Sequence, residues 1–248
     1  MIISHYLDAT YLKTAIQAGI TEKENLEKVV ALTKEAINYD YKLVMIRSNY
    51  ITTAKKIISI SGAKVLIGTV IDFPCGNASL KQKIQEAEKA IKLGADELDF
   101  VVNYNAFKKG NIDMVTEEVT CCIALCLRHH KIAKFIIEAA ALSNEEIIVI
   151  SQLMKQIVLE NFGEENAENV FVKSSTGFFK TEREMPNGAT FENIMLISKN
   201  AKPLKIKAAG GVRDYETALK MIALGADRIG TSSSKEIINK EQHTNQSY

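Results

Sequence analysis

Two lysines in this sequence stand in or directly after short apolar runs. Lys173 ends Phe-Val-Lys in "FVKSSTGF", and Lys207 lies in "KIKAAGGV". Burial disfavours the cationic form of a lysine and lowers its pKa, and a neutral amine is a nucleophile that can form a Schiff base with a carbonyl. The alternative is structural: the amine reaches the rim of the fold or pairs with a carboxylate. Lys173 alone does not decide between these two interpretations.

Two aspartates occur in comparable surroundings. Asp99 stands inside the apolar run of "DELDFVVN", and Asp8 stands in "HYLDATYL". Buried charges are costly unless they are paired. If these aspartates converge with the two lysines, the four groups form either a catalytic site or a structural ion-pair network.

Glycine and hydroxyl residues follow the last two apolar runs. The string "AGGV" covers residues 209–212, and "GTSS" covers residues 230–233 at the start of a predicted helix. Backbone N–H groups at the start of a helix bind anions, and nearby hydroxyls add donors. These two strings therefore predict a phosphate-binding site.

The elements that must position these residues follow from the hydrophobic pattern, because short apolar runs alternate with longer amphipathic segments. Thr21 with Glu24, and Ser143 with Glu146, are expected to form capping boxes at helix starts. The predicted strands are Leu7–Thr10, Leu43–Ile46, Val65–Val70, Leu98–Val102, Phe135–Ile137, Val170–Lys173, Ile206–Ala208 and Arg228–Gly230. The predicted helices cover residues 22–38, 49–61, 79–93, 112–131, 144–160, 190–200, 214–224 and 232–240.

This alternation is typical of parallel strands joined by helices. Eight such units in 248 residues match the size of one (β/α)8 TIM barrel, and a doubly wound open sheet is the alternative. We expect one barrel domain over residues 1–239 and a flexible C-terminal tail over 240–248. In a barrel, the loops after the strands open on one face, so the lysines, the aspartates and the glycine loops should meet there.

Composition excludes several classes of partner. The 31 basic and 30 acidic residues leave a net charge of +1, which gives no reason to expect nucleic acid or an anionic membrane as partner. No segment is apolar enough to span a membrane, and the N-terminus lacks the pattern of a signal peptide. The four cysteines are interpreted as buried thiols in a reducing cytoplasm. The four histidines lack metal-site spacing, so no metal is expected.

Several strings together resemble the deoxyribose-phosphate aldolase family of class I aldolases. They are "LDATYLK", "DFPCG", "ADELDFVVN", "FVKSSTGF", "NGAT" and "KAAGGVRDYETALKMIALGADRIGTSS", and they run from Leu7 to Ser233. The resemblance implies reversible cleavage of 2-deoxy-D-ribose 5-phosphate to D-glyceraldehyde 3-phosphate and acetaldehyde, without metal or cofactor. The small-molecule partner is then a sugar phosphate. The oligomeric state stays open, with a homodimer as the working expectation.

The resemblance also implies roles for individual residues. Lys173 matches the lysine that forms the Schiff base, Lys207 matches a second lysine that stays cationic, and Asp99 matches the aspartate of a proton relay. Asp8 and Thr10 match polar positions around the second lysine and the substrate. The remaining residues expected to bind substrate, mostly at its phosphate, are Thr176, Gly177, Gly210, Gly211, Ser232 and Ser233.

Some positions depart from the family pattern, and other functions remain open. Ala9, Met45 and Asp72 stand where many family members have His, Cys and Gly. Another Schiff-base aldolase or a transaldolase is a second possible enzyme, and a non-catalytic phosphate-binding barrel is a third interpretation. We also consider that the terminal Tyr248 folds back to the site and passes a proton to the enamine carbon.

Overall fold

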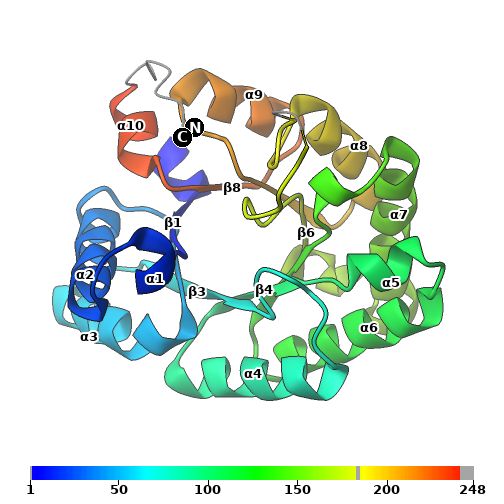
Figure 1. Cartoon of the computed structure of the whole chain (residues 1–248), viewed down its shortest axis with the longest axis horizontal. Coiled ribbons are helices and arrows are strands. Elements are labelled where there is room, and N and C mark those ends of the chain that lie inside the picture. Colours follow the sequence, from blue (N-terminus) through cyan, green and yellow to red (C-terminus); the bar gives the residue numbers. More distant parts are fainter. Residues whose placement is uncertain (1, 183–184, 241–248) are drawn as a thin grey trace.

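The computed structural model describes residues 2–182 and 185–240. Eight parallel strands pair in chain order, and β1 closes the ring by pairing with β8. Figure 1 shows the helices as an outer ring around this barrel. The predicted (β/α)8 TIM barrel is confirmed, and the open doubly wound sheet is excluded.

Each predicted strand overlaps one observed strand, and the observed bounds differ by a few residues at most. The strands are β1 (Leu7–Tyr11), β2 (Leu43–Ile46), β3 (Leu66–Ile71), β4 (Glu97–Val101), β5 (Ile132–Ile136), β6 (Val170–Lys173), β7 (Lys205–Ala209) and β8 (Arg228–Thr231).

Each predicted helix also has an observed counterpart, whereas the short helices α1 and α5 were not predicted. The α-helices are α1 (Ala15–Ala18), α2 (Glu22–Asn38), α3 (Ile51–Ser61), α4 (Leu80–Leu93), α5 (Tyr104–Lys108), α6 (Ile112–Arg128), α7 (Asn144–Phe162), α8 (Phe191–Ala201), α9 (Tyr215–Ala223) and α10 (Ser234–Asn239). The 3-10 helices are η1 (Ile3–Tyr6), η2 (Ser48–Tyr50), η3 (Ala139–Ala141) and η4 (Glu164–Asn169).

Helix starts follow local sequence. The capping boxes predicted at Thr21 and Ser143 are confirmed, because each hydroxyl accepts the backbone N–H three residues later and the glutamate carboxylate there accepts the backbone N–H of the capping residue. Two further capping boxes begin α1 and α4, with Gln in the third position. No helix in the described part of the chain is long and apolar enough to cross a membrane.

The barrel interior is divided into an apolar side and a charged side. Leu43, Met45 and Val70 fill the interior at β2 and β3. A Cβ on Gly68 would lie 2.5 Å from the Met45 methyl carbon, so the glycine leaves the space that the thioether occupies. The charged side faces β4 to β8 and β1, while the larger apolar core lies between the barrel and its helices.

Lys83 joins three elements beneath the loop that follows β3. Its fully buried ammonium donates to the carbonyls of Gly76 and Val101 at 3.2 and 2.7 Å and to Glu118 on α6 at 2.8 Å. Asp72 has a left-handed φ of 53° and lies 3.4 Å from the same ammonium. The charge that the sequence places after the third strand is therefore paired.

Two expectations need comment. Cys122 and Cys126 are buried and Cys121 is half-buried, but Cys75 is exposed, so the prediction that the thiols are buried is wrong for Cys75. The loop after β3 carries Cys75 past the strand end toward solvent. Residues 241–248 of the predicted tail, with Tyr248, lie outside the described residues.

We expect Lys83→Met to lower the free energy of unfolding by about 3–5 kcal/mol, because it leaves Glu118 buried without its cation. Urea unfolding followed by circular dichroism measures the loss. Lys81→Met, at an exposed position on the same helix, is the control and should change stability by about 0.5 kcal/mol or less. Equal effects of the two substitutions would show that the Lys83 contacts do not stabilise the fold.

Candidate active site

A cavity of about 730 Å³ opens at the carboxyl ends of the strands. This is the face on which catalytic residues of TIM barrels lie. The predicted site residues that line it are Thr10, Lys173, Thr176, Gly177, Gly210, Gly211 and Ser232. A second hollow of about 580 Å³ lies at the opposite end of the barrel and includes neither predicted lysine.

Backbone pairing continues past the strand ends and fixes the position of Lys173. The Ile137 N–H donates to the Lys173 carbonyl at 3.0 Å, and the Ser174 N–H donates to the Lys207 carbonyl at 3.1 Å. The Ser174 hydroxyl donates to the Ala209 carbonyl and accepts the N–H of the same residue. The residues after β5, β6 and β7 are therefore locked side by side.

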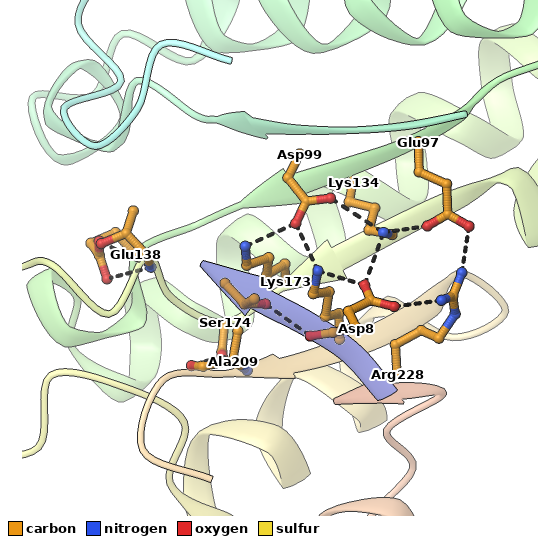
Figure 2. A network of polar contacts seen from close by, with 12 residues as sticks. Asp8, Glu97, Asp99, Lys134, Glu138, Lys173, Ser174, Ala209 and Arg228 are labelled. Atoms are coloured by element: carbon orange, nitrogen blue, oxygen red, sulfur yellow. Dashed lines mark hydrogen bonds and ion pairs between the residues drawn. The ribbon is translucent and has the colours of Figure 1, made fainter. Parts of the chain in front are cut away.

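Asp99 brings the two lysines together (Figure 2). Its Oδ2 atom lies 2.8 Å from the Lys173 ammonium nitrogen and 2.9 Å from that of Lys207. Asp99 and Lys207 are fully buried, whereas Lys173 is 3% exposed and reaches the cavity. The lysine expected to react is thus the one that a substrate can touch, and the second lysine lies behind it.

A deeper layer of charges supports this trio. Asp8 Oδ2 lies 2.6 Å from the Lys207 nitrogen, and its Oδ1 lies 2.5 Å from Arg228. Lys134 lies 3.1 Å from Asp8 and 3.3 Å from Asp99, and it also pairs with Glu97. Asp8 does not line the cavity, so the structure places its carboxylate behind Lys207 and away from the substrate space.

The charges in this cluster balance only when one amine is neutral. Asp8, Glu97 and Asp99 supply three negative charges. Three positive charges come from the cations that each contact at least two of these acids, namely Lys134, Lys207 and Arg228. Lys173 would be a fourth cation and contacts only Asp99. An unbalanced buried charge is costly, so Lys173 is the member of the cluster that loses its proton most readily.

The pKa of Lys173 falls to about 8, first because of burial and then because of the neighbouring Lys207 cation. Asp99 acts in the opposite direction and raises this pKa. At pH 7 roughly a tenth of the molecules then carry the neutral amine, compared with about one in 2,500 for an ordinary lysine. Burial therefore contributes more than Lys207 to the nucleophilic form.

Asp99 is held in the ionised state. Burial alone would raise its pKa, but the three lysines around it keep the pKa well below its usual range. Such a carboxylate is a weak base and a good partner for positive charge.

The glycine loops pack backbone against backbone. Gly210 has a left-handed φ of 85°, and a Cβ there would lie 2.8 Å from the Gly188 Cα. The Ala189 N–H donates to the Gly210 carbonyl at 2.9 Å. Only glycine allows this close approach, which brings the "NGAT" string against the loop after β7.

The serines of the loop after β8 differ in whether they line the cavity. Ser232 lines the cavity. Ser233 is 8% exposed and its N–H donates to the Thr231 hydroxyl at 2.9 Å, so the structure does not place it in the cavity lining. Thr231, which belongs to the predicted "GTSS" string but was not among the individual residues expected to bind substrate, also lines the cavity.

Comparison with known proteins decides the family. The model of the DeoC/LacD family aldolases matches residues 5–240. The chain belongs to the DeoC/LacD aldolase family. Deoxyribose-phosphate aldolase of Caldicellulosiruptor saccharolyticus is 37% identical over 242 residues, which cover 96% of this chain and 98% of the relative. The deoxyribose-phosphate aldolase of Clostridium kluyveri is 39% identical over 218 residues, which cover 88% of this chain and 91% of the relative.

The same family appears among solved structures. Deoxyribose phosphate aldolase of Aeropyrum pernix, described as having a unique tetrameric structure, has a TM-score of 0.76 and 26% identity and covers 96% of this chain and 89% of its own. The resemblance carried by the lysine and glycine strings is confirmed. This DeoC/LacD aldolase is a carbon–carbon lyase built on the barrel described above.

Four charged residues around Lys173 escaped the sequence analysis of this aldolase. Lys134 lies within β5 and Glu97 begins β4, each just before the start of the predicted strand, and Arg228 was not singled out. Glu97 and Asp99 are two residues apart and therefore face the same side of a strand, which is a signal that could have found Glu97. Glu138 follows β5 and is 1% exposed.

No group of three His, Cys, Asp or Glu residues in the described ranges could hold a metal ion.

We expect Lys207→Leu to raise the pKa of Lys173, because it removes a nearby cation and leaves Asp99 to act on Lys173 more strongly. The reactive form is the neutral amine, so the rising limb of the pH–rate profile should move to higher pH by about one unit and turnover at pH 7 should fall at least about tenfold.

Steady-state turnover between pH 6 and 10 measures this shift. The control is Lys205→Leu, which removes a positive charge at the opposite end of the same strand and should leave the profile unchanged. If Lys207→Leu keeps the wild-type profile, Lys207 does not control the protonation of Lys173.

Proposed function

We propose that this aldolase cleaves 2-deoxy-D-ribose 5-phosphate reversibly to D-glyceraldehyde 3-phosphate and acetaldehyde through a Schiff base on Lys173. The observation that carries the proposal is the lowered pKa of this amine at the floor of the cavity, beside the buried cation of Lys207. Relatives named for this activity, over nearly their whole length, support the choice of substrate.

The neutral amine of Lys173 adds to the aldehyde carbon of the open-chain sugar, and loss of water gives an iminium. The bond between carbons 2 and 3 then breaks, and its electron pair moves toward the iminium nitrogen to give an enamine. The hydroxyl on carbon 3 loses its proton and becomes the aldehyde of glyceraldehyde 3-phosphate. Protonation of carbon 2 and hydrolysis release acetaldehyde and restore the amine.

The charges around Lys173 fit this sequence of steps. Formation of the iminium returns a positive charge to the Lys173 nitrogen, and the Asp99 carboxylate at 2.8 Å stabilises it. Lys207 favours the neutral amine before the substrate arrives. The family role of Asp99 in a proton relay remains a prediction, and its lowered pKa makes it a weak proton acceptor.

Substrate phosphate is proposed to bind at the glycine loops, where the predicted residues Gly177, Gly210, Gly211 and Ser232 line the cavity. Binding of a remote phosphate would hold the reacting carbon near Lys173 and contribute to the rate through orientation. Thr10 on β1 also lines the cavity, and its hydroxyl donates to the Asp8 carbonyl at 2.8 Å.

Two further expectations stay predictions. A cytoplasmic location rests on the interpretation of the free cysteines as thiols of a reducing compartment. The homodimer remains an expectation of the sequence analysis. One relative is described as having a tetrameric structure.

Trapping tests the proposed reaction directly. Incubation with deoxyribose 5-phosphate and borohydride, followed by peptide mapping, should place a two-carbon adduct on Lys173, and the untrapped reaction should release glyceraldehyde 3-phosphate and acetaldehyde. An adduct that retains all five sugar carbons, without released acetaldehyde, would indicate another reaction, and label on Lys207 would reverse the roles of the lysines.

We expect Ser232→Asp to lower kcat/KM for the phosphorylated substrate at least about tenfold more than for free deoxyribose, because it adds a negative charge to the proposed anion site. The ratio of kcat/KM for the two sugars measures this effect, with Ser232→Ala as the control for loss of the hydroxyl. Equal losses for both sugars would place the phosphate elsewhere.

A further inference from the structure

A second buried carboxylate lies near Lys173 and has no part in the charge cluster. Glu138 lies two residues after the end of β5, is 1% exposed and has a left-handed φ of 55°. Figure 2 shows it apart from the ion pairs that run from Lys173 to Arg228. A left-handed non-glycine residue is strained, and such strain is concentrated at functional sites.

The contacts of Glu138 lead to the cavity through Thr176. The Thr176 hydroxyl donates a short hydrogen bond to the Glu138 carboxylate, and the Thr176 N–H donates to it at 3.3 Å. The same hydroxyl oxygen accepts the Phe178 N–H at 3.0 Å. A hydroxyl has one donor and two acceptor positions, so one acceptor position of Thr176 remains, and Thr176 lines the cavity together with Lys173.

Glu138 is held firmly in this position. The Ala139 N–H donates to the Ser174 carbonyl at 2.8 Å, and the Ile137 N–H donates to the Lys173 carbonyl at 3.0 Å. These bonds on either side of Glu138 join the end of β5 to the turn that carries Thr176.

The two carboxylates near Lys173 have opposite environments. Asp99 contacts ammonium groups, which hold its pKa below the usual range. Burial raises the pKa of Glu138, although hydrogen bonds from Thr176 and the charge of Lys173 oppose this. Titratable groups whose environments separate their pKa values mark acid and base roles, so Glu138 is the stronger base of the two.

We propose that Thr176 and Glu138 form a proton relay that removes the proton from the substrate's carbon-3 hydroxyl during cleavage. This inference rests on the proposed function, because it assigns the base for the carbon–carbon cleavage step.

The proton transfers of this relay balance over one turnover. The carbon-3 hydroxyl gives its proton to the Thr176 oxygen while the Thr176 proton passes to Glu138, and the bond between carbons 2 and 3 breaks as the new carbonyl forms. The electron pair enters the iminium and gives the enamine. Glu138, now a carboxylic acid, returns the proton through Thr176 to carbon 2, which becomes the methyl carbon of acetaldehyde.

The sign of the pH dependence follows from this assignment. The relay needs ionised Glu138, so cleavage should slow as the pH falls through the pKa of that carboxyl. Two titratable groups of the described residues lie within its electrostatic reach, namely Lys173 on β6 and Tyr104 on α5. Lys173 does not titrate as a free amine once the iminium has formed, so single-turnover cleavage of the preformed complex separates the two groups.

Glu138→Gln is the decisive variant, because the amide oxygen still accepts hydrogen bonds from Thr176 but cannot take a proton. Borohydride trapping of acetaldehyde on Lys173 should stay within about twofold of wild type, whereas single-turnover cleavage should fall about 10²–10³-fold. The decline at acidic pH should also disappear. The matched control, Glu117→Gln at an exposed position on α6, should keep both rates.

A pair of substitutions at Thr176 tests the same relay without touching Glu138. Thr176→Ser keeps the hydroxyl and should cleave within about fivefold of wild type, whereas Thr176→Val should lose about as much as Glu138→Gln.

The other outcomes overturn the inference. Wild-type cleavage and pH profile in Glu138→Gln, or equal rates for the two Thr176 variants, would show that the contacts are structural. Loss of trapping in Glu138→Gln alone would assign Glu138 to iminium formation. Absence of any trapped Lys173 in the wild-type protein would instead refute the proposed function.

Discussion

One carboxylate oxygen shared by two ammonium groups determines the organisation of this barrel. Asp99 Oδ2 contacts both Lys173 and Lys207, and a buried carboxylate in this position requires cations, just as the cations require it. The ion pairing continues deeper into the barrel, because Lys207 also contacts Asp8. The other carboxylate oxygen of Asp8 is paired with Arg228. Lys173 contacts only Asp99, whereas Lys134 and Lys207 each contact at least two acids, so Lys173 gives up the fewest ion pairs when it becomes neutral. The reactive amine is therefore a consequence first of burial and then of its position beside acids that other cations already pair.

The fold accommodates these buried charges by keeping them apart from the apolar side of the barrel interior. Leu43, Met45 and Val70 fill the side of the barrel formed by β2 and β3, while the charged strands occupy the remainder. Closure of the barrel brings Asp8 on β1 beside Lys207 on β7 and Arg228 on β8, which are about 200 residues away in the sequence. A gain in packing between the barrel and its helices supplies the free energy that offsets the desolvation of the charges.

The sequence was sufficient for the barrel, because eight apolar runs alternating with amphipathic segments reflect local periodicity. It also located Lys173, Lys207 and Asp99, since each interrupts an apolar strand. Other parts depend on tertiary contacts that local patterns do not report. Lys134 lies at the edge of a predicted strand and acquires its role only from acids on β1 and β4. Glu138 depends on a left-handed turn, and the burial of Ser233 outside the cavity lining depends on how its loop packs.

The most direct test of this picture is the pKa of the Lys173 amine in the free enzyme. It can be obtained from the pH dependence of cyanoborohydride labelling with acetaldehyde, quantified at Lys173 by peptide mass spectrometry. We expect labelling to rise with pH through a midpoint near 8, where burial and the charge pairing place this amine. A midpoint near the ordinary lysine value of about 10.4 would contradict the central claim that the buried charge cluster discharges Lys173.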